Sequence, residues 1–140
     1  MMLMSDKEPA HYILYADDDP DDQDMVRELL PEILPHVELI VKDNGEDVIQ
    51  FINELPADAH LPSLIVLDLN MPGWDGIQTL SIIKRNKQFQ HVPVLLFSTT
   101  ANETDRDRAF LAGAVAFVTK PSRYSDFKTI IESFAAHLKS

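Results

Sequence analysis

The most constraining feature of this sequence is a short apolar run at residues 64–67 (LIVL) that ends in one acidic residue, Asp68. Four large apolar residues in succession predict a strand that is buried on both faces, as in the middle of a parallel sheet. Pro72, Gly73 and Gly76 then interrupt the pattern and predict a loop before the next helix. Ligands of open α/β sheets bind outside the carboxyl ends of the strands, so Asp68 stands where an active carboxylate is expected.

Similar apolar runs alternate with segments of helical periodicity along the rest of the chain. The runs lie at residues 11–16, 37–41, 64–68, 92–97 and 115–119. This alternation predicts βαβ units, and therefore an α/β fold with a mainly parallel sheet that helices cover on both faces. The chain shows no internal repeat or linker, and its 140 residues are enough for one domain with a single core.

Capping residues mark several of the helix boundaries. Asp19 and Pro20 predict an N-cap and a first helical position. Pro31 is expected to kink this helix or to end it early. Further along, Asn102 or Thr104 is expected to cap the helix that follows the fourth strand.

Composition and charge exclude several classes of function. The chain has no cysteine, which excludes disulfides and thiolate metal sites. Its formal net charge of −11 repels phosphate backbones, so we expect no nucleic-acid partner. No apolar run approaches the roughly 18 to 20 residues that span a bilayer, and residues 1–9 lack the features of a signal peptide. We therefore expect a cytoplasmic protein with no membrane contact, and a disordered lead-in at residues 1–9.

Residues with reactive or charged side chains follow four of the five predicted strands. Carboxylates that meet at one sheet edge repel each other unless a cation lies between them. A site with oxygen ligands and open coordination positions suits Mg²⁺. An ammonium and a hydroxyl opposite would stabilise an incoming phosphoryl group, which an aspartate can accept as nucleophile. The residues are Asp17 and Asp18 after the first strand, Asp68, Ser98 and Lys120. Together they predict in-line phosphoryl transfer.

Four segments carry the motifs of one known family. They are residues 13–18 (ILYADD), 68–76 (DLNMPGWDG), 93–98 (PVLLFS) and 112–121 (AGAVAFVTKP). Ser98 follows Asp68 by 30 residues (98 − 68), and Lys120 follows Ser98 by 22 (120 − 98). On these motifs the chain resembles the receiver domain of response regulators in two-component signalling. Residues 17–22 (DDDPDD) and the extended loop at residues 56–62 resemble most the stand-alone receivers associated with phytochromes. The resemblance implies a flavodoxin-like, doubly wound (βα)5 sandwich with strand order 2-1-3-4-5, formed by residues 10–140.

The same resemblance implies a role for each acidic residue and for the lysine. Asp68 would be the phosphoacceptor, and a sensor histidine kinase or a phosphotransfer protein would be the donor. Asp18, Asp68 and the backbone carbonyl of Asn70 would bind Mg²⁺ directly, whereas Asp17 would act mostly through water. Lys120 would pair with the phosphoryl group.

The resemblance also implies how phosphorylation would change the surface. Ser98 would move to bond the phosphoryl group, and Phe117 would turn inward into the space that this opens. The face built by the fourth helix, the fifth strand and the last helix would then change its binding of an effector protein. The resemblance also allows a homodimer through this face, which is a habit of the family. The protein would be a switch and not an enzyme, catalysing only its own phosphotransfer and autodephosphorylation.

Two other functions stay open on the sequence. A pseudo-receiver that serves only as an interaction scaffold is one, because Thr99 stands where the family has a smaller residue and would narrow the access of a phosphodonor. A phosphatase with an aspartyl nucleophile is the other, although such enzymes of the haloacid-dehalogenase type need an acid where this chain has Asn70. Phe117 can also be a plain core aromatic. The chain has no phosphate-binding loop of the nucleoside triphosphatase type.

Overall fold

The computed structural model describes residues 11–100 and 102–139 of the chain. The expected lead-in at residues 1–9 lies outside this part. The strands are β1 (His11–Ala16), β2 (Val37–Lys42), β3 (Leu64–Asp68), β4 (Val94–Ser98) and β5 (Ala116–Thr119). The helices are α1 (Pro20–Ile33), α2 (Gly45–Glu54), α3 (Gly76–Arg85), α4 (Glu103–Leu111) and α5 (Tyr124–Phe134), with short 3₁₀ turns at Lys87–Phe89 and Ala135–His137.

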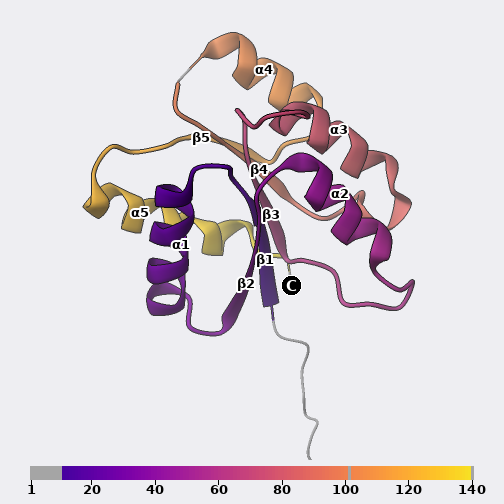
Figure 1. Ribbon diagram of the computed structural model, residues 1–140, viewed down its shortest axis with the longest axis horizontal. Helices are drawn as coiled ribbons and strands as arrows, with labels where there is room; N and C mark the ends of the chain where they lie inside the picture. The colour runs from indigo at the N-terminus through magenta and orange to yellow at the C-terminus, as the bar shows by residue number, and fades with distance from the viewer. Residues whose placement is uncertain (1–10, 101, 140) are drawn as a thin grey trace, which may run out of the picture.

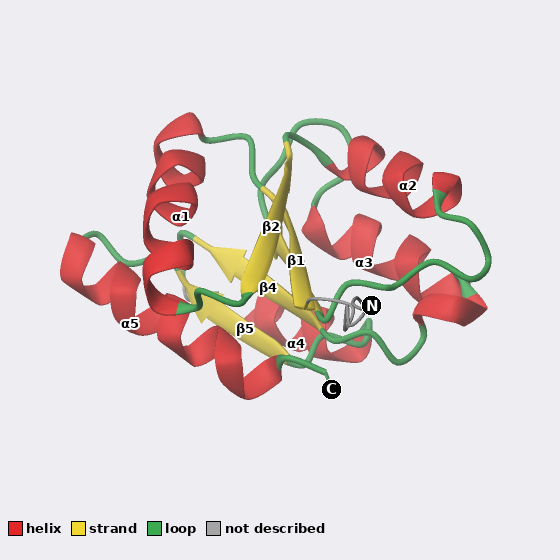
Figure 2. Cartoon of the chain, turned by 90° about the horizontal axis from the view of Figure 1, so that it is seen from below, coloured by secondary structure: helices red, strands yellow, loops and turns green. Residues whose placement is uncertain are grey.

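The strands form one parallel sheet in the order β2-β1-β3-β4-β5, which confirms the predicted fold class (Figure 1). Helices α1 and α5 pack on one face, and α2, α3 and α4 pack on the other (Figure 2). The central strand β3 is buried along its whole length, as its apolar run predicts. No helix in the described ranges is long and apolar enough to cross a membrane.

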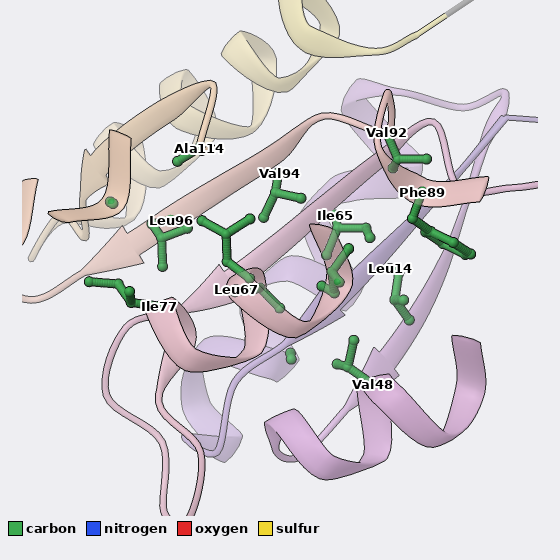
Figure 3. Packing of buried hydrophobic residues seen from close by; sticks show 14 of the residues in the cluster. Leu14, Val48, Ile65, Leu67, Ile77, Phe89, Val92, Val94, Leu96 and Ala114 are labelled. Atoms are coloured by element: carbon green, nitrogen blue, oxygen red, sulfur yellow. The ribbon is translucent and has the colours of Figure 1, made fainter. Parts of the chain in front are cut away.

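Alternate residues of the strands fill two cores, one on each side of the sheet. Ile65 and Leu67 point into the core beneath α2, α3 and α4 (Figure 3). Leu64 and Val66 point into the core beneath α1 and α5. Successive side chains of a strand point to opposite faces, so the continuous apolar run of β3 supplies both cores at once.

Two of the helix boundaries depend on the residues that the sequence singled out. The Asp19 side chain caps α1 by accepting from the Asp21 N–H, and the Asn102 side chain caps α4. Pro31 lies inside the last turn of α1, which ends at Ile33 rather than before the proline. A proline in the last turn costs only one backbone hydrogen bond, and the burial of the preceding turn holds the helix in place.

Candidate functional site

Backbone hydrogen bonds continue the sheet just beyond the strand ends and fix where the polar side chains emerge. The Leu69 N–H donates to the Phe97 carbonyl at 2.7 Å. The Lys120 N–H donates to the Ser98 carbonyl at 2.6 Å. The residues that follow β1, β3 and β5 are therefore held in register at the carboxyl edge of the sheet, which is the position that the sequence predicted for them.

The loop after β3 turns back sharply and leaves Asp68 at the rim formed by the carboxyl edge of the sheet. The Gly76 N–H donates to the Leu69 carbonyl at 2.9 Å. A Cβ atom on Gly76 would lie 2.6 Å from the Asp68 carbonyl oxygen, so only glycine lets α3 begin this close to β3. Asp75 and Gln78 form a capping box that fixes the first turn of α3.

Three aspartates meet at this rim. Carboxylate oxygens of Asp17, Asp18 and Asp68 lie within 4.8 Å of one another. Asp17 is fully buried and Asp68 is 3% exposed, whereas Asp18 is exposed to solvent. The Asn70 N–H donates to Asp68 Oδ1 at 3.2 Å, which places the Asn70 backbone beside the same carboxylate. Hard oxygen donors from three carboxylates, one of them exposed on Asp18, fit a divalent cation that keeps part of its water shell.

Lys120 lies opposite the aspartates, and its ammonium is shared by three carboxylates. The Nζ atom lies 2.8 Å from Asp17 Oδ2, 2.7 Å from Asp22 Oδ2 and 3.4 Å from Asp68 Oδ2. The side chain is 7% exposed, and Nζ lies 5.6 Å from the centroid of the Phe97 ring. The sequence therefore placed Lys120 correctly beside Asp17 and Asp68, but it did not identify Asp22 as a member of the site.

Asp17 is held from three sides. The Tyr15 hydroxyl donates to Asp17 Oδ2 at 2.6 Å, and the Asp19 N–H donates to Asp17 Oδ1 at 2.9 Å. The Gln23 side-chain amide donates to the Asp17 carbonyl oxygen and, at 2.8 Å, to Asp43 Oδ1. Tyr15 was not among the residues expected at the site, although a buried tyrosine two residues before the acidic pair needs a partner for its hydroxyl. These bonds orient Asp17 before any ligand arrives.

The crowding of acidic groups changes their proton affinities. Burial raises the pKa of Asp68 to about 7, and the negative charge of Asp17 adds to this rise, while Lys120 opposes it. Burial also raises the pKa of Asp22, in spite of its bond to Lys120. The pKa of Lys120 is raised: burial lowers it, but the bonds to Asp17 and Asp22 outweigh burial. The site therefore has an excess of negative charge, which a divalent cation would neutralise.

Ser98 and Phe117 lie on the side of the site next to α4. Ser98 is fully buried, and its Oγ accepts from the Thr100 N–H at 3.1 Å, so the hydroxyl is engaged by its own loop. Phe117 is half-buried and packs against the core beneath α2, α3 and α4. Thr99 is exposed beside this loop.

Comparisons with known proteins agree with this geometry. The family model described as the response regulator receiver domain matches residues 13–132. Response regulator Rcp1 of Synechocystis is 33% identical over 137 residues, which are 94% of this chain and 93% of that protein. Protein PilG of Pseudomonas aeruginosa is 32% identical over 108 residues, 74% of this chain and 77% of that one.

Solved structures show the same similarity. The phosphorylated cyanobacterial phytochrome response regulator RcpA superposes with a TM-score of 0.81 at 26% identity, covering 89% of this chain and 91% of that one. The Mn²⁺-bound form of Rcp1 superposes with a TM-score of 0.79 at 27% identity, and the match covers 90% of this chain and 92% of that one.

Proposed function

The chain belongs to the family of response regulator receiver domains, which are signalling switches rather than enzymes, and we propose that phosphorylation of Asp68 operates this switch. The donor is a histidine kinase or a phosphotransfer protein. The observation that carries this proposal is that Asp68 lies close both to two other aspartates and to the Lys120 ammonium. This arrangement supports a phosphoacceptor because the aspartates can bind a cation, and the Lys120 ammonium can bind the oxygens of a phosphoryl group.

The residues present fit Mg²⁺ as the cofactor. Asp18 and Asp68, with the Asn70 carbonyl, supply direct ligands in this proposal, and Asp17 acts through water. When bound, the ion offsets the negative charge of the site and of the phosphoryl group. The Mn²⁺-bound structure of Rcp1 supports a divalent ion in a similar protein.

In the transfer step, a carboxylate oxygen of Asp68 forms a bond to phosphorus while the bond from phosphorus to the donor histidine nitrogen breaks. The imidazole leaves with the electron pair of that bond. The Lys120 ammonium donates to the oxygens of the transferred group and offsets their charge. Asp68 needs to be ionised to attack, so the binding of a cation beside it favours the reactive form.

Phosphorylation then changes the face formed by α4, β5 and α5. Ser98 leaves its contact with Thr100 to bond the phosphoryl group, and Phe117 turns inward. Several apolar side chains are exposed around this face, which supports a role in binding an effector or a second copy of the chain. They are Phe110, Leu111, Val115 and Tyr124.

Phosphorylation by acetyl phosphate with Mg²⁺ tests the proposal. We expect the intact mass to rise by one phosphoryl group in the wild type and in Asp58→Asn, a matched change in an exposed loop, but not in Asp68→Asn. A wild type that takes up no phosphoryl group and binds no beryllofluoride would indicate the scaffold instead. Sustained release of phosphate from an added phosphomonoester would indicate the phosphatase.

Asp18→Asn tests the metal site separately. Asp18 is exposed, so the variant should fold as the wild type does but should bind Mg²⁺ at least about tenfold more weakly. Quenching of Trp74, the single tryptophan and 37% exposed in the loop after β3, measures the affinity. An unchanged Mg²⁺ affinity would remove Asp18 from the ligand set.

A further inference from the structure

One of the two closest carboxylates to the Lys120 ammonium comes from a helix and not from a strand end. Asp22 Oδ2 of α1 lies 2.7 Å from Nζ, as close as Asp17 Oδ2 at 2.8 Å, whereas Asp68 Oδ2 lies 3.4 Å away. We propose that Asp22 is a positioning residue that holds Lys120 toward α1 and so weakens the interaction of the Lys120 ammonium with a phosphoryl group at Asp68. The inference rests on the proposed function of Asp68.

The local structure of α1 explains why Asp22 is free to reach Lys120. Asp22 is the third residue of the helix, where an acidic side chain commonly turns back to the N–H of the N-cap residue. Here the N–H of the N-cap, Asp19, already donates to Asp17 Oδ1. Asp22 therefore has no capping role at that N–H and points across the site, where its side chain is 19% exposed.

Asp22 also cannot easily follow Lys120 if the ammonium moves. The next residue, Gln23, is buried, and its side-chain amide bonds both the Asp17 carbonyl oxygen and Asp43. These bonds fix the first turn of α1 against β1 and the end of β2. A shift of Lys120 toward the phosphoryl group therefore lengthens the contact with Asp22.

Charge gives the direction of the effect. An ammonium has three N–H donors, and Nζ has three carboxylate oxygens within 3.4 Å. A phosphoryl group on Asp68 has to take one of these donors, and its negative charge is repelled by Asp22. Asparagine at position 22 keeps an oxygen that can accept from Lys120 but removes the charge, so Lys120 becomes a stronger partner for the phosphoryl oxygens.

Beryllofluoride binding at saturating Mg²⁺ measures this effect without turnover. We expect Asp22→Asn to bind beryllofluoride about fivefold more tightly than the wild type, the size of a partly screened charge at close range. Asp22→Glu, which keeps the charge, should stay within about twofold of the wild type. Asp22→Ser is a second neutral variant if the asparagine variant does not fold.

Asp21→Asn is the matched control, because Asp21 lies in the same helical turn but is exposed to solvent. Both asparagine variants lose the same favourable interaction with the helix dipole, so a merely structural effect would appear in both. We expect Asp21→Asn to stay within about twofold of the wild type. Nitrogen-15 NMR of the lysine ammonium groups should show a shifted Lys120 signal in Asp22→Asn and an unshifted one in Asp21→Asn.

The outcomes separate this inference from the proposed function. A wild type that neither binds beryllofluoride nor is phosphorylated would overturn both. A wild type that binds it, with Asp22→Asn equal to Asp21→Asn or weaker than the wild type, would overturn the restraint by Asp22 alone. An unshifted Lys120 signal in a tighter-binding Asp22→Asn would show that Asp22 acts on the phosphoryl group directly and not through Lys120.

Discussion

The two sides of the sheet hold the acidic site in different ways. On the α1 side, charged and hydrogen-bonded contacts join the site to a well-buried helix: Asp22 bonds Lys120, and the buried residues of α1 are Gln23, Val26, Leu29 and Leu30. On the α4 side, the site meets one serine hydroxyl and a half-buried phenylalanine. Ala109 is the one buried residue of α4, all nine residues of which are described.

This difference indicates which side can move. A movement of α1 would expose large apolar side chains and break several bonds to charged groups. A movement of α4 costs little, because α4 buries few side chains. Segments with few buried contacts are the ones that change position in switching proteins. The α1 side is therefore a fixed wall of the site, and the α4 side is the part that can respond to phosphorylation.

The largest expected contrast comes from the same substitution on the two sides. Leu29 in α1 is fully buried and Leu111 at the end of α4 is 88% exposed. Leu29→Ala should lower the free energy of unfolding by about 3 kcal/mol, because it removes buried methyl groups and leaves a cavity. Leu111→Ala should change it by less than about 0.5 kcal/mol. Urea denaturation measures both, and equal losses would contradict the difference between the sides.

The negative charge of the buried Asp68 carboxylate should make stability depend on pH. Asp68 has a pKa of about 7 in the folded chain and an ordinary value of 3.8, so the folded state binds more protons between these values. Without a divalent ion, the contribution of Asp68 to the free energy of unfolding should therefore fall as pH rises from about 4 to 7. Asp68→Asn removes this charge and should be more stable than the wild type by about 2 kcal/mol at pH 8.

A comparison of the wild type with Asp68→Asn at pH 4 tests this prediction. At pH 4 the Asp68 carboxyl is protonated in the folded state, so the two proteins should differ little in their unfolding by urea with EDTA present. Mg²⁺ at pH 8 should also reduce the difference in the free energy of unfolding between the two proteins, because it stabilises the wild type. An Asp68→Asn protein that is less stable than the wild type at pH 8 would show that the carboxylate of Asp68 stabilises the fold.

Sequence predicted the framework well because the framework depends on local patterns. The run at residues 64–67 is buried on both faces as predicted, and Asp19 and Asn102 cap the helices that they precede. The fourth strand is shifted: residues 92–97 were predicted, and Val94–Ser98 is found. Pro93 has no N–H for the sheet ladder, so regular pairing starts after it.

The site was predicted only as far as the strand ends determine it. Asp17, Asp18, Asp68 and Lys120 meet because parallel strands end at one edge, and this follows from the fold. The contact of Asp22 with Lys120 joins residues 98 positions apart and depends on which way a helical side chain turns. The bond between the Asp19 N–H and Asp17 is local, but the partner that Asp22 turns to, Lys120, is supplied by the distant end of β5, and no pattern around Asp22 indicates it.

The smallest expected effect compares two hydroxyl groups, one on each side of the site. Tyr15→Phe removes the bond to Asp17 and should lower the free energy of unfolding by about 1.5 kcal/mol, because the acceptor is a buried carboxylate. Ser98→Ala should lower the free energy of unfolding by less than about 0.5 kcal/mol, since the donor to Ser98, Thr100, is exposed and water can replace the bond.

The response to beryllofluoride, followed by Trp74 fluorescence, should rank the two variants in the opposite order. Ser98→Ala should lose most of the fluorescence change at saturating ligand and Tyr15→Phe should keep it, because the serine is on the side that moves. A Ser98→Ala protein with the full change, or a Tyr15→Phe protein without it, would place the moving side next to α1 instead.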